Sequence, residues 1–250
     1  MPSLRKAKAF HIGCAGWSIP REFAGRFSDV GTHLQRYGGT FSAVEINSSF
    51  YRPHRAATYA RWAESVPKHF RFSVKMPKQI THEQRLVDTA KQVAKIVNEA
   101  TALGDHLGCF LVQLPPSLKL NVKIAGEFFR ELRACYAGPV VCEPRHVSWF
   151  SAASAELLKH HCIGRVAADP APYSAAGQPA GNSLVTYFRL HGSPTMYYSA
   201  YTSEYLATLA ATLTTYREQG DDIWCIFDNT AEGFATANAL ELQAMLSARA

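Results

Sequence analysis

Side chains suited to acid–base and anion-binding chemistry occur at the ends of short apolar runs in this 250-residue chain. Glu45, Lys75 and Glu143 each lie at the end of one run, and Arg189 and His191 alternate in another. Carboxylates and histidine transfer protons, lysine can also act as a nucleophile, and arginine binds phosphate or carboxylate oxygens in pairs. The pattern predicts one site that combines proton transfer with recognition of an anion.

The candidate residues divide into groups that would react and groups that would hold the substrate. The catalytic candidates are Glu45, Glu143, His191 and Lys75, with a glutamate as general base or acid assisted by His191. If the two glutamates approach each other, one carboxyl pKa should rise, and that residue would be the acid. The substrate-binding candidates are Trp17, Asn47, Tyr51, Arg52, His82, Gln113, Arg145, His146, Asp169, Arg189, Tyr198, Asp228 and Asn229.

Eight apolar runs, most of them rich in β-branched or aromatic residues, indicate the strands that must position these groups. They are Phe10–Ala15, Ser42–Asn47, Phe70–Lys75, Cys109–Leu114, Val140–Glu143, Gly164–Asp169, Leu184–His191 and Asp222–Asp228. Helical patterns fill most gaps, at Ala56–Ser65, Gln84–Leu103, Val122–Tyr136, Ser203–Arg217 and Ala235–Ser247. Between strands six and seven, residues 170–182 are too rich in Pro and Gly for a helix.

Strands that alternate with helices imply a parallel sheet and an α/β fold. Eight such units in 250 residues predict a single domain over residues 1–250, folded as a (β/α)8 TIM-like barrel with an irregular, Pro/Gly-rich connection between strands six and seven.

Alternation along each strand predicts which side chains enter the barrel. Val44 and Ile46 suit the helix layer, so Glu45 faces the lumen. The same reasoning places Ser73, Lys75, Gln113, Glu143, Asp169, Tyr187, Arg189, His191 and Asp228 at the carboxyl-terminal rim, where barrel active sites lie. A hydrogen-bonded cluster that only closes the top of the barrel remains the structural alternative.

The composition favours anionic partners. The formal net charge is +6, and the isoelectric point is near 9.0, which attracts small anions or nucleic acids. No apolar run reaches the ~18 residues that span a bilayer, and no signal-peptide core follows the amino terminus, so a cytoplasmic protein without a membrane partner is expected. Six cysteines without a CxxC pair are expected to be reduced thiols. The oligomeric state is not indicated.

The common nucleotide, zinc and hydrolase motifs are missing from the chain. There is no GxxxxGK[ST], no GxGxxG after a strand, no HExxH and no GxSxG. No cofactor is therefore predicted. A divalent metal is possible because carboxylates and a histidine share the rim, but the neighbouring basic side chains argue against it, and no metal ligand is assigned.

Seven segments, taken in order, carry a family resemblance. They are GCAGW at 13–17, VEINSSFYRPH at 44–54, FSVKMPKQITHEQRL at 72–86, LVQLPPS at 111–117, EPRHVSW at 143–149, FRLHGS at 188–193 and FDNTAEGFATANALEL at 227–242. The set resembles the YecE-like family, domain-of-unknown-function family 72. The resemblance implies a TIM-like barrel and no established reaction. Pro144 and Asp228 depart from the residues common in that family, an aromatic and an Asn, so a role carried over to Asp228 is in doubt.

The resemblance also implies a set of characteristic polar positions. These fall on Glu45, Asn47, Lys75, His82, Gln113, Glu143, Arg145, His146, Arg189, His191 and Asn229.

Three functions fit these residues. The first is a hydrolase- or lyase-type enzyme that acts on a phosphate-bearing substrate, such as a nucleic acid or sugar phosphate, with Lys75, Arg145 and Arg189 on the phosphate. The second is a non-catalytic nucleic-acid-binding module, which needs the positive charge gathered in one patch. The third is a carbonyl proton-transfer or Schiff-base enzyme that uses Lys75.

Overall fold

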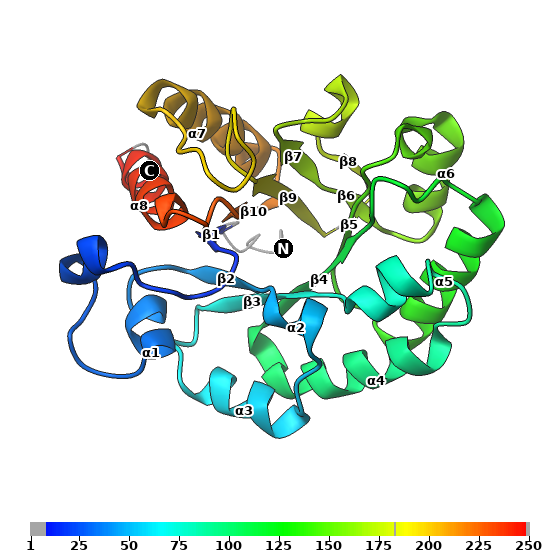
Figure 1. The fold of residues 1–250 in the computed structure, drawn as a ribbon, viewed down its shortest axis with the longest axis horizontal. Coiled ribbons are helices and arrows are strands. Elements are labelled where there is room, and N and C mark those ends of the chain that lie inside the picture. The colour runs from blue at the N-terminus through cyan, green and yellow to red at the C-terminus, as the bar shows by residue number, and fades with distance from the viewer. Residues whose placement is uncertain (1–8, 183, 249–250) are drawn as a thin grey trace, which may run out of the picture.

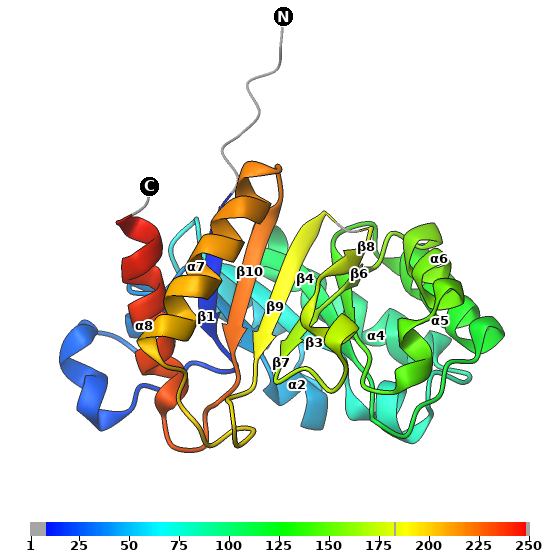
Figure 2. The same ribbon diagram turned by 90° about the horizontal axis from the view of Figure 1, so that it is seen from above.

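Parallel strands alternate with helices in the computed structural model, which describes residues 9–182 and 184–248 (Figure 1). The strands are β1 (Phe10–Cys14), β2 (Ala43–Ile46), β3 (Arg71–Lys75), β4 (Leu107–Gln113), β5 (Val140–Glu143), β6 (Gly164–Arg165), β7 (Ala167–Asp169), β8 (Ala180–Gly181), β9 (Val185–Leu190) and β10 (Asp222–Phe227). The α-helices are α1 (His33–Gly38), α2 (Ser48–Tyr51), α3 (Ala56–Glu64), α4 (Ala90–Ala100), α5 (Val122–Cys135), α6 (Ala152–His160), α7 (Ser203–Glu218) and α8 (Phe234–Ser247). The longer helices lie outside the strands (Figure 2).

The strands form two sheets. One has the order β1-β10-β9-β7 and the other β2-β3-β4-β5-β6-β8, with every pairing parallel except β6 with β8. The predicted α/β class is thus confirmed, whereas the expected single sheet is divided in two. The sheets meet along residues 164–169, whose first part pairs with β5 and whose last part pairs with β9.

The second meeting of the sheets is between β1 and β2. One bridge joins Ala15 to Glu45, and elsewhere side-chain hydroxyls replace backbone partners. The Tyr37 hydroxyl accepts from the Cys14 amide (2.7 Å) and donates to the Ala43 carbonyl (3.1 Å). Gly13 is required here, because a Cβ at this position would lie 1.9 Å from the Ala43 oxygen. This junction fixes β2, and therefore Glu45, relative to β1.

Apolar side chains pack in two separate cores, as the alternation predicts. The larger core lies between strands and helices and includes Val44, Phe110 and Leu209. The smaller core contains only strand residues or residues next to strands, so it lies on the side of the strands away from the helices. Its members are Ala43, Cys109, Leu111, Val141, Val166, Val185, Tyr187, Trp224 and Ile226. This inner core is the floor below the predicted rim.

The predicted strands agree with the structure to within two residues at each end, apart from the division of Gly164–Asp169. The helix predicted over Gln84–Leu103 is wrong at both ends. Only Ala90–Ala100 is α-helical, and Arg85, Leu86 and Asp88 have positive φ angles that no α-helix accepts. Leu86 is still buried, so its apolar signal came from a loop packed on the core.

Residues 170–182 contain a short 3₁₀ turn, Ser174–Gly177, and strand β8, which pairs antiparallel with β6. No helix within residues 9–182 and 184–248 is long and apolar enough to cross a membrane.

Tyr37→Phe should lower the free energy of unfolding by about 1–3 kcal/mol, because it leaves a buried amide of β1 and a buried carbonyl of β2 without a partner. Urea unfolding measures this change. Tyr51→Phe is the control, since Tyr51 is 70% exposed. Equal stabilities for the two variants would show that the hydroxyl does not hold the junction.

Candidate functional site

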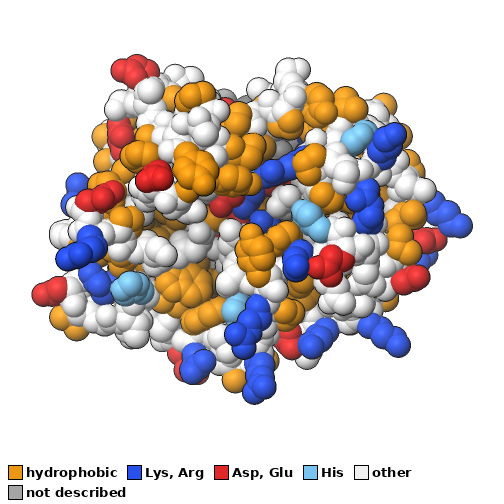
Figure 3. Space-filling model, in the orientation of Figure 1, with side chains coloured by type: hydrophobic (Ala, Val, Ile, Leu, Met, Phe, Trp, Pro, Cys, Tyr) orange, Lys and Arg blue, Asp and Glu red, His pale blue; other side chains and the backbone are white. Residues whose placement is uncertain are grey.

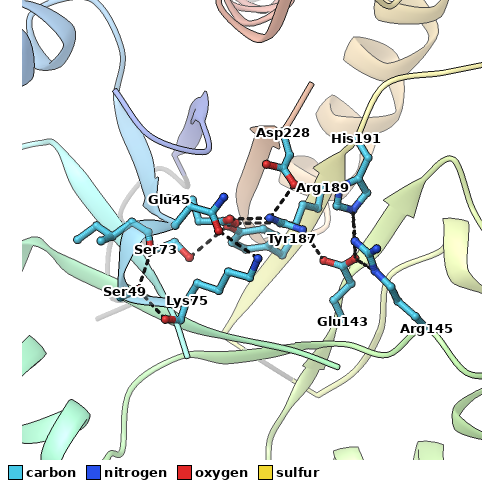
Figure 4. A network of polar contacts seen from close by, with 12 residues as sticks. Glu45, Ser49, Ser73, Lys75, Glu143, Arg145, Tyr187, Arg189, His191 and Asp228 are labelled. Carbon is cyan, nitrogen blue, oxygen red and sulfur yellow. Dashed lines mark hydrogen bonds and ion pairs between the residues drawn. The ribbon is translucent and has the colours of Figure 1, made fainter. Parts of the chain in front are cut away.

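Arg189 lies at the centre of a buried ion-pair network (Figure 4). Its Nε donates to Glu45 Oε2 (3.0 Å) and its Nη2 to Glu45 Oε1 (2.8 Å). Nη1 donates to Glu143 Oε2 (3.0 Å), and Nη2 also lies 2.9 Å from Asp228 Oδ2. The Arg189 side chain has no exposed surface. One guanidinium therefore joins carboxylates from β2, from β5 and from the residue after β10.

The strand register brings these groups to one level. Glu45 pairs with Ser73 across β2 and β3, and Glu143 pairs with Gln113 across β4 and β5. Tyr187 lies two residues before Arg189, on the same face of β9. Its hydroxyl donates to Glu45 Oε2 (2.9 Å). Both Glu45 oxygens are thus occupied, and its side chain is fully buried.

The ion pairs determine the charge states. Burial alone would raise the pKa of Glu143, but Arg189, His191 and Arg145 together hold it well below its usual range. Burial likewise opposes ionisation of Asp228, yet Arg189 and His191 lower its pKa. A raised carboxyl pKa, expected if Glu45 and Glu143 met directly, does not occur at Glu143, because Arg189 lies between the two.

His191 bridges the network to the mouth of the site. Its Nδ1 lies 3.1 Å from Asp228 Oδ2, and its Nε2 lies 3.1 Å from Glu143 Oε1 and 3.3 Å from Arg145 Nη2. Arg145 also lies 2.9 Å from Glu143 through Nη2, and 16% of its side chain is exposed. Arg145 is therefore the arginine of this network that solvent can reach.

Sequence reasoning selected Tyr198, but its neighbour Tyr197 contacts the network. The Tyr197 ring packs edge-on against His191, 5.8 Å between centroids, and its hydroxyl interacts with Arg145. Tyr198 is 56% exposed. The difference between them is conformational: Tyr197 has a φ of 69°, and its ring contacts His191 although 37% of the residue stays exposed. No sequence motif marks this.

Lys75 enters the site from β3. Its Nζ donates to Asn47 Oδ1 (3.0 Å) and lies 4.3 Å from the centre of the Phe50 ring. Burial, reinforced by the positive charge of Arg189, lowers the pKa of Lys75 to about 8. Among the described residues, the structure gives Lys75 no carboxylate within ion-pair distance. Phe50 is a second contact that the predicted site did not include.

Three other predicted residues, from the segments after β2 and β3, lie at or near the surface. Tyr51 and Arg52 are exposed beyond Phe50. His82 is half-buried, with its ring edge-on to Phe50, and its Nδ1 bonds Thr81 Oγ1 (2.8 Å). Burial and the charges of Lys75, Arg145 and Arg85 lower the pKa of His82, which shows that positive charge collects at this side of the mouth.

Several predicted binding residues mainly support loops. The His146 ring accepts from the Ser148 amide and caps a 3₁₀ turn. Asn229 Nδ2 donates to the Ser199 carbonyl and to Asn238. Gln113 is buried beside Glu143 and donates to the Leu114 carbonyl. The half-buried Trp17 ring packs edge-on against Trp62 of α3.

The prediction that Asp169 joins the inner cluster is wrong. Val166 packs in the inner core and Ala167 in the outer one, so alternation turns Asp169 toward the helices. There it lines a cavity with Phe188, Tyr205 and Leu209. The inner site therefore holds three carboxylates, those of Glu45, Glu143 and Asp228, against three basic groups, those of Lys75, Arg145 and Arg189.

A divalent cation would need carboxylate oxygens as ligands. In this site the oxygens of Glu45 and Glu143 already accept hydrogen bonds from Arg189 and Arg145. Among the described residues, no group of three or more His, Cys, Asp or Glu is arranged to hold a metal ion.

The described chain is thus an α/β protein with a balanced ionic site inside parallel strands. The family model described as "Protein of unknown function DUF72" matches residues 11–250, and the chain belongs to this family, as the resemblance indicated. The UPF0759 protein YecE of Escherichia coli K12 is 27% identical over 173 residues, 66% of this chain and 61% of that protein. The UPF0759 protein YunF of Bacillus subtilis is 28% identical over 151 residues, 56% of this chain and 52% of that protein. The matches thus cover less than two thirds of these relatives.

Two solved structures share the fold. A DUF72 family protein from Thermotoga maritima has a TM-score of 0.77 and 24% identity, covering 96% of this chain and 99% of that one. Another from Enterococcus faecalis has a TM-score of 0.76 and 20% identity, covering 96% and 98%.

Arg189→Met should lower the free energy of unfolding at pH 7 by about 3–5 kcal/mol, because it leaves buried carboxylates unpaired. Glu143 and Asp228 have lowered folded-state pKa values, so their stabilisation is present above their unfolded pKa values of ~4 and is lost as the pH falls. The difference from wild type should therefore shrink below about pH 4. Urea unfolding across pH checks this, with the exposed Arg61→Met as control. A pH-independent difference would contradict it.

Proposed function

We propose that this protein is an enzyme whose substrate carries an anionic group such as phosphate, bound at the carboxyl-terminal ends of the strands. One observation carries the proposal: Arg189 takes up the carboxylates, while Arg145 reaches the mouth and the buried Lys75 is hydrogen-bonded only to the neutral Asn47 in the described chain. Figure 3 shows basic and acidic side chains side by side near the centre of one face.

The wider frame of the proposal is a closed (β/α)8 barrel. It is supported by the two meetings of the sheets, at the β1–β2 bridge and along residues 164–169. In such barrels the loops after the strands form the active site. Lys75, Arg145 and His82 all belong to the ends of β3 and β5 or to the segments that follow them.

In the proposed mechanism, Arg145 and His82 bind the anion and Lys75 transfers the proton. A pKa of about 8 suits Lys75 for this role, because proton transfer is most efficient when the pKa lies near the working pH. Glu45 is occupied by Arg189 and Tyr187, so its role is to position Arg189. Glu143 stays ionised and orients Arg145 and His191.

Inorganic phosphate should raise the melting temperature of the wild-type protein by several degrees. A ligand at ~100 times its Kd adds about 2.7 kcal/mol, and each kcal/mol moves Tm by about 2–4 °C in a chain of this size. Arg145→Gln should abolish the shift, because the anion loses its most accessible arginine. Arg130→Gln, at an exposed position on α5, should keep it. Differential scanning fluorimetry measures all three.

Two other outcomes would change the assignment. A shift that survives Arg145→Gln would place the anion elsewhere. A shift caused only by short oligonucleotides and lost steeply with added salt would favour the non-catalytic nucleic-acid-binding module.

A second candidate function is Schiff-base chemistry on a carbonyl compound. The observation that favours it is the buried Lys75 amine, which has a lowered pKa and packs over Phe50. A neutral amine attacks a carbonyl carbon, water leaves, and a C=N bond forms.

Borohydride should then trap an adduct on Lys75 when small aldehydes or ketones are supplied, as read by peptide mass spectrometry. Trapping should be faster at pH 9 than at pH 7, because the neutral amine increases as the pH rises through about 8. The exposed Lys78 is the internal control, and labelling equal to that of Lys78 would remove this candidate.

A further inference from the structure

A serine and a histidine outside the ion-pair network form a hydrogen-bonded pair after β2. Ser48 is the first residue of α2, and its Oγ lies 2.9 Å from Nε2 of His54, in the segment between α2 and α3. Ser48 is exposed, and among the described residues its hydroxyl has no second hydrogen-bond partner. A hydroxyl within hydrogen-bond reach of an imidazole is the arrangement in which serine acts as a nucleophile and histidine as its base.

Two other hydroxyl–histidine pairs in the described chain lack these properties. Thr81 Oγ1 lies 2.8 Å from His82 Nδ1, but Thr81 is fully buried. Ser148 Oγ lies 2.9 Å from His146 Nδ1, but it also accepts from the Leu120 amide (2.7 Å), and the same ring nitrogen accepts from the Ser148 amide. Both of these hydroxyls therefore support local structure, whereas the hydroxyl after β2 is open to solvent.

Aromatic side chains hold the His54 ring in place. The ring packs edge-on against Trp62 (4.9 Å between centroids) and Tyr59 (5.8 Å), both from α3. Burial, reinforced by the positive charge of Arg52, lowers the pKa of His54. The imidazole is therefore neutral at pH 7, which is the form that can accept the hydroxyl proton of Ser48.

The neighbouring Ser49 fixes α2, and with it Ser48, to the ends of two strands. Its hydroxyl lies 2.7 Å from the carbonyl of Ile46 at the end of β2 and 2.6 Å from the carbonyl of Lys75 at the end of β3 (Figure 4). Ser49 is fully buried. The two adjacent serines thus differ in role, because one anchors the helix and the other faces solvent beside a histidine.

Apolar surface and positive charge lie next to the pair. Trp62, which contacts His54, also packs edge-on against Trp17 from the segment after β1 (5.0 Å between centroids), and both indoles are partly exposed. Arg52 is exposed and close enough to influence the pKa of His54. Indole rings favour an apolar group, and a nearby cation favours the negative charge that develops on the oxygen of an attacked carbonyl.

We propose that Ser48 and His54 form a second reactive centre, which hydrolyses carboxylic esters with a small apolar acyl group. Ser48 Oγ attacks the carbonyl carbon as its proton passes to His54 Nε2, and the alcohol leaves with that proton. Water then attacks the acyl-serine and gives a proton to His54, and the carboxylic acid leaves as Ser48 takes that proton back. This centre does not depend on the proposed anion site.

Labelling with an alkyl fluorophosphonate, which loses fluoride to a nucleophilic serine, tests the pair. Peptide mass spectrometry of the wild-type protein should find the label on Ser48 and none on Ser28 or Ser148. His54→Gln should slow the labelling of Ser48 about 100-fold, because a general base contributes about 10²–10⁴-fold. No label on Ser48 of the wild-type protein would overturn the proposal without any variant, and equally fast labelling of His54→Gln would overturn the role of the base.

Hydrolysis of p-nitrophenyl butyrate, followed through released p-nitrophenolate, tests turnover. Ser48→Ala and His54→Gln should both lose the enzyme-dependent rate. Ser28→Ala is the matched control and should keep it, because Ser28 is exposed and its hydroxyl contacts only the Val30 backbone in the described chain. A wild-type rate no higher than that of Ser48→Ala would overturn the hydrolytic activity.

These outcomes are separate from those of the proposed function. Loss of the phosphate-induced shift in melting temperature in Arg145→Gln reports on the anion site alone. The fluorophosphonate label on Ser48 reports on the second centre alone, so either proposal can fail while the other stands.

Discussion

The structure of the site depends on one buried guanidinium. Arg189 binds carboxylates of β2, β5 and the residue after β10, and each of these would be costly to bury alone. Desolvated ion pairs are tolerated only when geometry and hydrogen bonds are complete. The network therefore forms only when the strand register brings the ends of these distant segments to the same level.

The inward-facing side chains could be predicted from the sequence, because side chains along a strand alternate between its two faces. Once Val44 and Ile46 are placed toward the helices, Glu45 must face inward, and the same argument holds for Lys75, Glu143 and Arg189. The period also holds from Val166 to Asp169, but the prediction chose the wrong face for Asp169. Gly164–Asp169 changes partner from β5 to β9 around Val166, and the residue types along this run do not mark which of its faces is the inner one.

Other parts of the site could not be read from residue types. Whether Arg189 lies between Glu45 and Glu143, or the two carboxylates face each other, depends on contacts between strands far apart in the chain. Tyr197 and Leu86 owe their positions to left-handed backbone conformations that no composition signal marks. The helix predicted from residue 84 shows the reason: buried apolar residues in a strained loop resemble a helical stripe.

The proposed function depends on where the charges of the site lie. Arg189 offers one positive charge to three carboxylates, and Arg145, which also pairs with Glu143, supplies a second. Lys75 instead lies inside the strands with a lowered pKa and a neutral partner, a position that costs stability while it stays protonated. Between about pH 8 and its unfolded pKa of ~10.4, that cost diminishes as the folded state loses the proton before the unfolded state does. The proposed proton transfer uses a lysine in this state, so Lys75 is the residue on which the proposed function depends most.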